Sequence, residues 1–212
     1  GQLDMMQDYC TRRFGSRPSG FWTAERVWDP EIPRLVSGLG LDYTILDDNH
    51  FRYAGIEEDE LYGYYLTERL DRRLAVFPID RFLRYSIPFR MPADTIDYFR
   101  SVADRRGECA FLYGDDGEKF GMWPGTYKWV FEEKWLVNFV EAVLREDWID
   151  TTLPSEYLRQ NPPIGRVYLT QGSYYELSEW ALPSKVASRL IDLNAEIKSW
   201  NREKDFCPFL KG

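Results

Sequence analysis

Short apolar segments that end in carboxylates alternate along this chain with segments of helical period. Strand and helix character in alternation predicts a parallel sheet with helical crossovers, and therefore an α/β fold. Acidic residues directly after strands are typical of an α/β barrel, where the chemistry lies at the carboxyl ends of the strands. The expected strands are Phe21 to Val27, Tyr43 to Leu46, 61–68, 73–78, Glu108 to Tyr113 and Arg166 to Leu169. The expected helices are Met5 to Phe14, Pro30 to Leu39, Asp94 to Arg105, Tyr127 to Arg145, Ser155 to Gln160 and Pro183 to Lys204.

The composition is rich in aromatic side chains, and acidic residues outnumber basic ones, 35 to 27. Aromatic residues make up 17% of the 212 residues, and eight of them are Trp. Sugar rings have apolar C–H faces that stack on aromatic planes, so the excess favours a saccharide site. A large core filled with Trp is the alternative. The net charge is −8 and there is no basic stripe, which argues against nucleic-acid binding.

Sequence patterns typical of several other function classes are absent. The three cysteines, Cys10, Cys109 and Cys207, form no CxxC pair, which favours a reducing compartment. No apolar run approaches the roughly 18 residues of a membrane span, and no signal-peptide pattern is present. P-loop, GxGxxG and Ser/His/Asp patterns are absent as well. We therefore expect a cytoplasmic protein that uses no membrane and no cofactor.

The segment 22–30, Trp-Thr-Ala-Glu-Arg-Val-Trp-Asp-Pro, places a carboxylate between two Trp side chains. Surface Glu residues usually lie among Lys, Gln and Ser, so this setting indicates a cleft with aromatic walls. Glu25 is expected at a strand end, where neighbouring donors keep a carboxylate ionised and able to act as a nucleophile. A structural pair of Glu25 with Arg26 under a loop is the alternative.

A second acidic segment, 114–125, reads Gly-Asp-Asp-Gly-Glu-Lys-Phe-Gly-Met-Trp-Pro-Gly. Repulsion among Asp115, Asp116 and Glu118 favours protonation of at least one carboxyl. A carboxyl that stays protonated, and that Trp123 desolvates, suits a general acid. An acidic surface turn and a calcium loop are the alternatives, although the alternating oxygen ligands of a calcium loop are missing. Two carboxylates beside aromatic platforms are the groups that glycosidic-bond chemistry needs.

Asp47-Asp48-Asn49-His50 follows an expected strand and contains the one histidine of the chain. Barrel deacetylases bind a metal with one Asp and two His, and a single His cannot complete that set, so no metal site is expected. We expect a substrate contact from His50. Asp48 is expected either to contact substrate or to cap the following helix. The segment 173–183 is a further candidate aromatic subsite, with ordinary packing as the alternative.

The segments 22–27 and 116–121 resemble the nucleophile and acid/base motifs of glycoside hydrolase family 57, whose members are retaining enzymes active on α-glucans. In the acid/base motif the catalytic Asp lies two residues before the Glu, which selects Asp116 over Asp115. The segments 123–127 and 179–183 resemble the branch of 4-α-glucanotransferases and α-amylases. The resemblance covers nearly the whole chain. The family's first two motifs, its last conserved region and its C-terminal β-rich domain are missing from these 212 residues.

The resemblance implies part of an incomplete (β/α)7 barrel of the glycoside hydrolase/deacetylase type, with N- and C-terminal portions missing. Residues 1–212 would then be a single partial catalytic domain. Glu25 is the implied nucleophile and Asp116 the implied acid/base, facing each other at the ends of two parallel strands. Substrate contacts are expected from Trp22, Arg26, Trp28, Asp48, His50, Glu118 and Trp123.

The function implied is cleavage of α-1,4-glucans or maltooligosaccharides by double displacement, and 4-α-glucanotransferase fits best. An α-amylase-type hydrolase and a catalytically inactive carbohydrate-binding fragment are the alternatives. A metal-dependent deacetylase would need more His ligands than the chain has. The isolated chain is expected to be inactive and to aggregate, because a barrel without its first strand exposes sheet edges and apolar interior.

Overall fold

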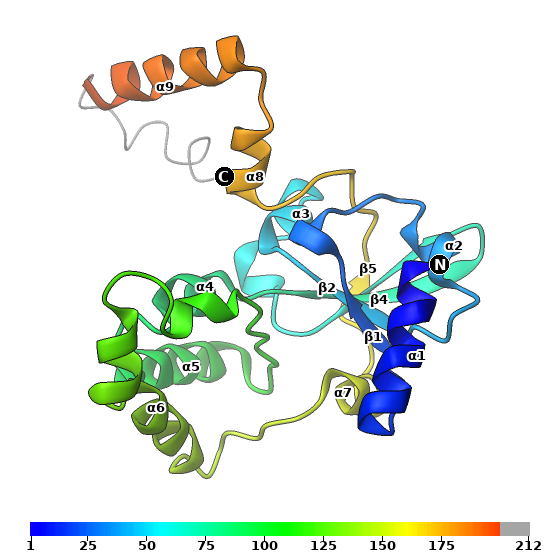
Figure 1. Ribbon diagram of the computed structural model, residues 1–212, viewed down its shortest axis with the longest axis horizontal. Coiled ribbons are helices and arrows are strands. Elements are labelled where there is room, and N and C mark those ends of the chain that lie inside the picture. Colours follow the sequence, from blue (N-terminus) through cyan, green and yellow to red (C-terminus); the bar gives the residue numbers. More distant parts are fainter. Residues whose placement is uncertain (200–212) are drawn as a thin grey trace.

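The structure is a computed structural model that describes residues 1–199. Within that range the strands form one sheet of five, in the order β1-β2-β4-β3-β5 (Figure 1). β1 (Gly20–Trp22), β2 (Tyr43–Leu46) and β4 (Arg72–Pro78) run parallel to one another. β3 (Tyr65–Arg69) is antiparallel to β4, and β5 (Gly165–Arg166) pairs with β3 in parallel. The sheet is therefore mixed, with its three parallel strands on one side.

Helices follow the parallel strands and then form a group of their own. α4, α5 and α6 lie together beside the sheet, whereas α8 and α9 lead away from it (Figure 1). The helices are α1 (Gln2–Phe14), α2 (Ile32–Val36), α3 (Asp48–Tyr53), α4 (Arg81–Ser86), α5 (Pro92–Arg106), α6 (Trp135–Leu144), α7 (Pro154–Gln160), α8 (Tyr175–Trp180) and α9 (Ser184–Ser199). Short helical turns complete the set: η1 (Ala24–Arg26), η2 (Glu58–Glu60), η3 (Gly117–Phe120) and η4 (Lys128–Glu132).

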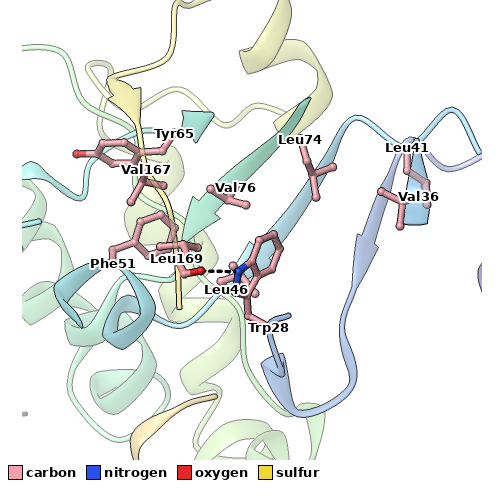
Figure 2. Packing of buried hydrophobic residues seen from close by; sticks show 10 residues of the cluster. All are labelled: Trp28, Val36, Leu41, Leu46, Phe51, Tyr65, Leu74, Val76, Val167 and Leu169. Carbon is pink, nitrogen blue, oxygen red and sulfur yellow. Dashed lines mark hydrogen bonds between the residues drawn. The ribbon is translucent and has the colours of Figure 1, made fainter. Parts of the chain in front are cut away.

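The sheet is buried on both faces because β4 alternates its side chains between two apolar clusters. Leu74 and Val76 belong to the cluster of Figure 2, which also contains Trp28, Val36, Leu41, Leu46, Phe51, Tyr65, Val167 and Leu169. Ala75 and Phe77 point to the opposite face and pack with Tyr64, Tyr157 and Leu158. Because both faces are covered, polar side chains at this sheet gather at its ends.

A third apolar cluster joins the helices of the group beside the sheet. Leu83 and Ile87 at α4 are buried there with Trp135 of α6. Trp135 also donates its indole N–H to the carbonyl of Arg90 at 2.6 Å, and Trp129 donates to the carbonyl of Pro88 at 2.6 Å. These contacts hold the segment from η4 to α6 against the loop that joins α4 to α5.

Two predicted strands are wrong in length or type. The strand predicted from Phe21 ends at Trp22, because Glu25 and Arg26 both have positive φ angles that leave the extended conformation. The segment Glu108 to Tyr113 is not a strand of the sheet. Its hydrogen bonds run from the amide of Ala110 to the carbonyl of Tyr62 at 3.3 Å, and from the amide of Asp80, which follows β4, to the carbonyl of Leu112 at 2.8 Å. Asp116 thus follows a segment without regular secondary structure, not a strand of a parallel ladder.

The long helix predicted from Tyr127 to Arg145 is interrupted. A π-helical turn (η4) comes first, and Lys134 then adopts a left-handed conformation with φ 59° before α6 begins. The interruption allows both Trp129 and Trp135 to reach the same loop. Their tertiary contacts with that loop outweigh the local preference for one continuous helix.

Other predicted elements are confirmed. β2 has the predicted bounds, the pair predicted at 61–68 and 73–78 is the β3–β4 hairpin, and α1, α2, α5 and α7 lie where they were expected. The strand predicted from Arg166 is shorter, since β5 ends at Arg166. The last predicted helix is present as α9 up to Ser199, and the remainder lies outside the described residues. The incomplete barrel stays a prediction, because the described chain shows a single mixed sheet.

Candidate active site

Polar side chains follow each of the three parallel strands at the same edge of the sheet. Glu25 comes after β1, Asp47 after β2 and Asp80 after β4. Parallel strands bring their carboxyl ends to one edge, which is where α/β folds place their sites. Asp80 is buried, which raises its pKa, and it caps α4 by accepting from the amide of Leu83 at 2.9 Å. This edge is the candidate active site.

Glu25 lies in a strained turn. Its φ and ψ angles are 53° and 25°, and Arg26 after it has φ 51°. Left-handed conformations are uncommon outside Gly and cost about 1–3 kcal/mol per residue, so the surroundings must enforce them. The turn is closed by hydrogen bonds from the amide of Arg26 to the carbonyl of Thr23 and from Val27 to Ala24. Strain of this kind concentrates at functional sites.

The segment 172–174 holds this turn from outside. Gly172 and Trp28 exchange two backbone hydrogen bonds, of 2.8 and 3.2 Å. Ser173 Oγ donates to the carbonyl of Glu25 at 2.5 Å, and Tyr174 donates its hydroxyl to Glu25 Oε2 at 2.6 Å. Both the backbone and the carboxylate of Glu25 are therefore fixed by residues almost 150 positions away. Sequence reasoning had placed Tyr174 only in a possible aromatic subsite.

Arg26 is buried beside Glu25 and faces aromatic rings. Its guanidinium lies 4.0 Å from the centroid of the Tyr174 ring and 5.8 Å from that of Trp22. Its Nε and Nη1 atoms are buried and have no hydrogen-bond partner among residues 1–199. A guanidinium against a ring face is stabilised by the ring quadrupole, by about 2 kcal/mol or more when it is desolvated. The ion pair of Arg26 with Glu25, which was the alternative interpretation of this segment, is not among the salt bridges found within residues 1–199.

In the second acidic segment Asp115 and Asp116 have different environments. The side chain of Asp115 is 1% exposed and forms an ion pair with Lys119, one turn further along η3. Asp115 Oδ1 also accepts from the amide of Asp116 at 2.9 Å. Asp116 and Glu118 are exposed, so the predicted desolvation of Asp116 by Trp123 is wrong for the described chain. Lys119 was missed by sequence reasoning, although its i+4 spacing from Asp115 was a visible signal.

The two acidic segments meet through Trp22 and Gly114. A Cβ atom added at Gly114 would lie 3.0 Å from Cζ3 of Trp22 and 3.3 Å from the side chain of Ile79. Gly114 comes two residues before Asp116, and Trp22 three residues before Glu25. Trp22 is nevertheless 42% exposed, so part of its ring is available to a ligand. The Glu25 and Asp116 segments therefore lie at the same edge of the sheet.

A charge network around the buried Asp47 lies between these two segments. Arg84 of α4 donates from Nη1 to Asp47 Oδ2 at 3.0 Å, and the same nitrogen is 3.7 Å from Glu176 Oε2. Tyr85 donates its hydroxyl to Glu176 as well. Burial opposes ionisation of Glu176, but the Tyr85 hydrogen bond and the nearby cations Arg84 and Arg26 outweigh it, so its pKa lies below the usual value. No sequence motif had marked Arg84.

Asp48 and His50 are buried at the start of α3. Burial, followed by repulsion from Asp47, raises the pKa of Asp48 to about 7. Burial lowers the pKa of His50, whose Nδ1 lies 3.1 Å from the carbonyl of Asp47. Asp47 is the residue that caps α3, through a hydrogen bond from the amide of Asn49, and not Asp48. Because Asp48 and His50 are both buried, neither presents a surface for the predicted substrate contact.

The two remaining predicted aromatic contacts differ from each other. Trp28 is 0% exposed and donates its indole N–H to the carbonyl of Leu169 at 3.3 Å (Figure 2). It is a core residue, which corrects its predicted place among the substrate contacts. Trp123 is 41% exposed and stacks on Phe89 with ring centroids 6.0 Å apart. Lys119 Nζ lies 5.6 Å from each of these two ring centroids. Trp123 thus keeps accessible ring surface beside the Asp115–Lys119 pair.

Two further features bear on the class of protein. Residues 1–199 hold no group of three or more His, Cys, Asp and Glu side chains placed to bind a metal ion. In the same range no helix has both the length and the apolar character for crossing a membrane.

Relatives of the chain carry the names of two enzyme activities, 4-alpha-glucanotransferase and alpha-amylase. The 4-alpha-glucanotransferase of Thermococcus kodakarensis is 41% identical over 211 residues, which is 100% of this chain and 32% of that protein. The alpha-amylase of Pyrococcus furiosus is 40% identical over 211 residues, with the same two coverages. The chain therefore spans about a third of the length of these relatives.

Solved structures agree with the sequence relationship. The crystal structure of the 4-alpha-glucanotransferase from Thermococcus litoralis matches with a TM-score of 0.90 and 40% identity, over 98% of this chain and 32% of that chain. The alpha-amylase AmyC from Thermotoga maritima matches with a TM-score of 0.64 and 14% identity, over 84% of this chain and 48% of that one, a likeness of fold alone. The sequence profile of glycosyl hydrolase family 57 matches residues 1–170. The chain belongs to glycosyl hydrolase family 57.

Proposed function

We propose that the protein of which this chain is part is a retaining 4-α-glucanotransferase that cleaves α-1,4-glucosidic bonds. The observation that carries the proposal is the contact between Trp22 and Gly114, because it brings the Glu25 and Asp116 segments to one edge of the sheet. Family membership and the relatives named 4-alpha-glucanotransferase support it further. A retaining enzyme needs its two carboxyl groups roughly 5–5.5 Å apart, and we expect that separation in the substrate complex.

The first half of the reaction uses both carboxyl groups. The Glu25 carboxylate attacks the anomeric carbon of the glucan while the bond from that carbon to the glycosidic oxygen breaks. Asp116 donates its proton to the departing oxygen, which leaves as the hydroxyl of the released sugar. A glycosyl ester on Glu25 remains. The hydrogen bond from Tyr174 keeps the Glu25 carboxylate in one orientation for this attack.

The second half returns the glucan to an acceptor. Asp116, now a carboxylate, takes the proton from the acceptor hydroxyl, whose oxygen attacks the anomeric carbon and displaces the Glu25 carboxylate. Two inversions give net retention of configuration. A sugar acceptor gives transglycosylation, and water gives hydrolysis. The exposed ring surfaces of Trp22 and Trp123 favour a bound sugar at this edge, because sugar faces stack on aromatic planes.

Hydrolysis is the second candidate activity. It is favoured by the relatives named alpha-amylase, whose identity of 40% is almost that of the glucanotransferases. The two activities differ in their products. Incubation of the full-length protein with maltotriose should give glucose together with longer oligosaccharides, with a constant number of reducing ends. A steady rise in reducing ends without longer products would instead assign the protein as a hydrolase.

The mechanism is tested by changing each carboxyl group in the full-length protein. Glu25→Gln should abolish turnover and leave maltooligosaccharide binding largely intact, because binding comes from stacking and hydrogen bonds. Asp116→Asn should be as severe for maltooligosaccharides but milder for activated aryl glycosides, which need little protonation. The matched control is Glu141→Gln, which removes an exposed ion pair with Arg145 on α6 and should change neither rate.

Mass spectrometry of the protein after proteolytic digestion locates the covalent intermediate. With an activated glycosyl substrate and Asp116→Asn, the glycosyl group should accumulate on a peptide containing Glu25. Turnover of maltooligosaccharides by Glu25→Gln would remove Glu25 from the nucleophile role. Tight glucan binding without any turnover by the wild-type protein would favour the inactive carbohydrate-binding alternative.

A further inference from the structure

Arg84 lies where the candidate site and the helical group meet. Its side chain is 11% exposed and extends from α4 to Asp47, the residue that follows β2. The 3.0 Å hydrogen bond to Asp47 Oδ2 joins a buried cation to a buried carboxylate, a pair that is costly to break by removal of one partner. Glu176 lies 3.7 Å from the same nitrogen. These two carboxylates fix the guanidinium in one place.

The guanidinium of Arg84 also packs against the ring of Tyr174. It lies 5.1 Å from the ring centroid, while the guanidinium of Arg26 lies 4.0 Å from the same centroid. Ring faces attract cations, so the two arginines restrict the position of this phenol. The hydroxyl of the restricted ring donates to Glu25 Oε2 at 2.6 Å. The orientation of the Glu25 carboxylate thus depends on a ring that Arg84 helps to hold.

The backbone of Arg84 reaches the second acidic segment. Its carbonyl oxygen accepts a hydrogen bond from Lys119 Nζ at 2.6 Å, and Lys119 forms an ion pair with Asp115. Asp115 in turn accepts from the amide of Asp116 at 2.9 Å. A single residue is therefore connected through its side chain to Glu25 and through its backbone to Asp116. Among the hydrogen bonds and ion pairs of the described residues, no other residue of α4 is connected to both the Glu25 turn and the Asp116 segment.

We propose that Arg84 is a positioning residue, whose guanidinium holds the ring of Tyr174 so that Glu25 points at the reacting carbon beside Asp116. The proposal rests on the proposed function, since it assumes that Glu25 is the nucleophile. Arg84 acts through Tyr174 and contacts no reacting atom. A small loss of alignment between reacting groups can lower a rate about 100-fold, so the expected effect is on turnover.

The test uses Arg84→Lys in the full-length protein. Lys keeps the positive charge beside Asp47 but lacks the planar guanidinium that faces Tyr174. We expect kcat on maltooligosaccharides to fall roughly 10- to 100-fold, with KM changed less than about twofold because uniform binding is retained. Arg73→Lys is the matched control, since Arg73 is an exposed arginine of β4 whose partner is Glu68. It should leave both constants unchanged.

A double-mutant cycle with Tyr174→Phe separates positioning from a general loss of structure. If Arg84 acts through the Tyr174 hydroxyl, Arg84→Lys should have little further effect on kcat in the Tyr174→Phe background. Effects of Arg84→Lys and Tyr174→Phe that multiply in full, or a wild-type kcat with a lowered melting temperature, would overturn the proposal.

The proposed function has a separate readout in the same assay. Glu25→Gln with normal turnover would contradict the proposed function itself. An inactive Glu25→Gln together with independent effects of Arg84 and Tyr174 would contradict only the positioning role. If Arg84→Lys is recovered at a low yield of folded protein, labelling by the activated glycosyl substrate counts the competent sites, and kcat per labelled site decides between the two outcomes.

Discussion

Tyr174 donates its hydroxyl to Glu25 Oε2 at 2.6 Å, although the two residues lie 149 positions apart in the sequence. The contact is secured by the backbone bridge between Trp28 and Gly172 and by the bond from Ser173 to the Glu25 carbonyl. A carboxylate in a turn with positive φ is held from both sides by a distant part of the chain. Such support is what a preorganised nucleophile requires.

Tyr174→Phe should lower kcat while the fold is retained. The ring remains between its two arginines, but the hydrogen bond to a charged carboxylate is lost, an interaction worth about 1.5–3 kcal/mol. If that energy serves alignment in the transition state, kcat should fall about 10- to 100-fold. Steady-state kinetics on maltooligosaccharides with the full-length protein measures the change.

Tyr168→Phe is the control for Tyr174→Phe. Tyr168 also donates to a glutamate, Glu68, at 3.1 Å, but at an exposed position away from the candidate site. Its loss should leave kcat and KM unchanged. Equal effects of the two substitutions, or no effect of Tyr174→Phe on kcat, would show that the Tyr174 hydrogen bond is not needed for turnover.

Gly114→Ala should impair activity through the contact that joins the two acidic segments. The new methyl group would lie 3.0 Å from Trp22 and 3.3 Å from Ile79, so either the ring or the segment before Asp116 must move. A shift of a few tenths of an ångström in either segment should lower kcat/KM about tenfold.

Gly117→Ala provides the comparison within the same acidic turn. A Cβ atom there would meet no atom within 4 Å, so this variant should keep wild-type kinetics. The pair of variants is assayed on maltooligosaccharides, with binding measured by calorimetry. A fully active Gly114→Ala would mean that the Trp22 contact does not set the geometry of the site.

Local sequence patterns predicted an element well where its residues alternate between the two buried faces of the sheet. β2 alternates between two apolar faces, and its bounds could be predicted because each residue belongs to one face. The positive φ angles of Glu25 and Arg26 had no glycine to signal them. The contact of Glu25 with Tyr174 joins residues 149 positions apart, and a local pattern carries no information about such a contact. The candidate carboxylates could be identified from the sequence, but the distant residues that hold them in place could not.

The same limit applies to the tryptophans on either side of Glu25. Both flank the carboxylate in sequence, but Trp28 turns into the core and Trp22 stays 42% exposed. Trp28→Ala should destabilise the fold by about 3–5 kcal/mol, since it removes a fully buried indole and leaves a cavity. Trp22→Ala should weaken maltooligosaccharide binding by about 0.5–1.5 kcal/mol with a smaller effect on stability.

Two measurements on the full-length protein separate the two tryptophans. Hydrogen exchange of peptides from β2 and β4 reports the stability of the sheet, and calorimetry reports glucan affinity. Trp28→Ala should accelerate exchange, and Trp22→Ala should lower affinity. A loss of affinity from Trp28→Ala in a protein with unchanged exchange would contradict the core assignment of Trp28.

Asp48 should make the stability of the fold depend on pH. Its pKa is raised from the ordinary 3.8 to about 7, first by burial and then by Asp47. Between these values the folded protein keeps a proton that the unfolded chain has released. The contribution of Asp48 is therefore complete below about pH 4 and is lost as the pH rises through 7, with a slope of about 1.4 kcal/mol per pH unit.

Asp48→Asn tests this sign, because its side chain resembles the protonated acid at every pH. Compared with the wild type, the variant should gain melting temperature between pH 5 and pH 8, since only the wild type must ionise a buried carboxyl over that range. Asp147→Asn, at an exposed position after α6, should show no such pH-dependent gain. Carbon-13 NMR of labelled aspartate gives the pKa directly. A difference in melting temperature that is constant with pH, together with a titration near pH 4, would show that the Asp48 carboxyl is ionised in the folded protein at neutral pH.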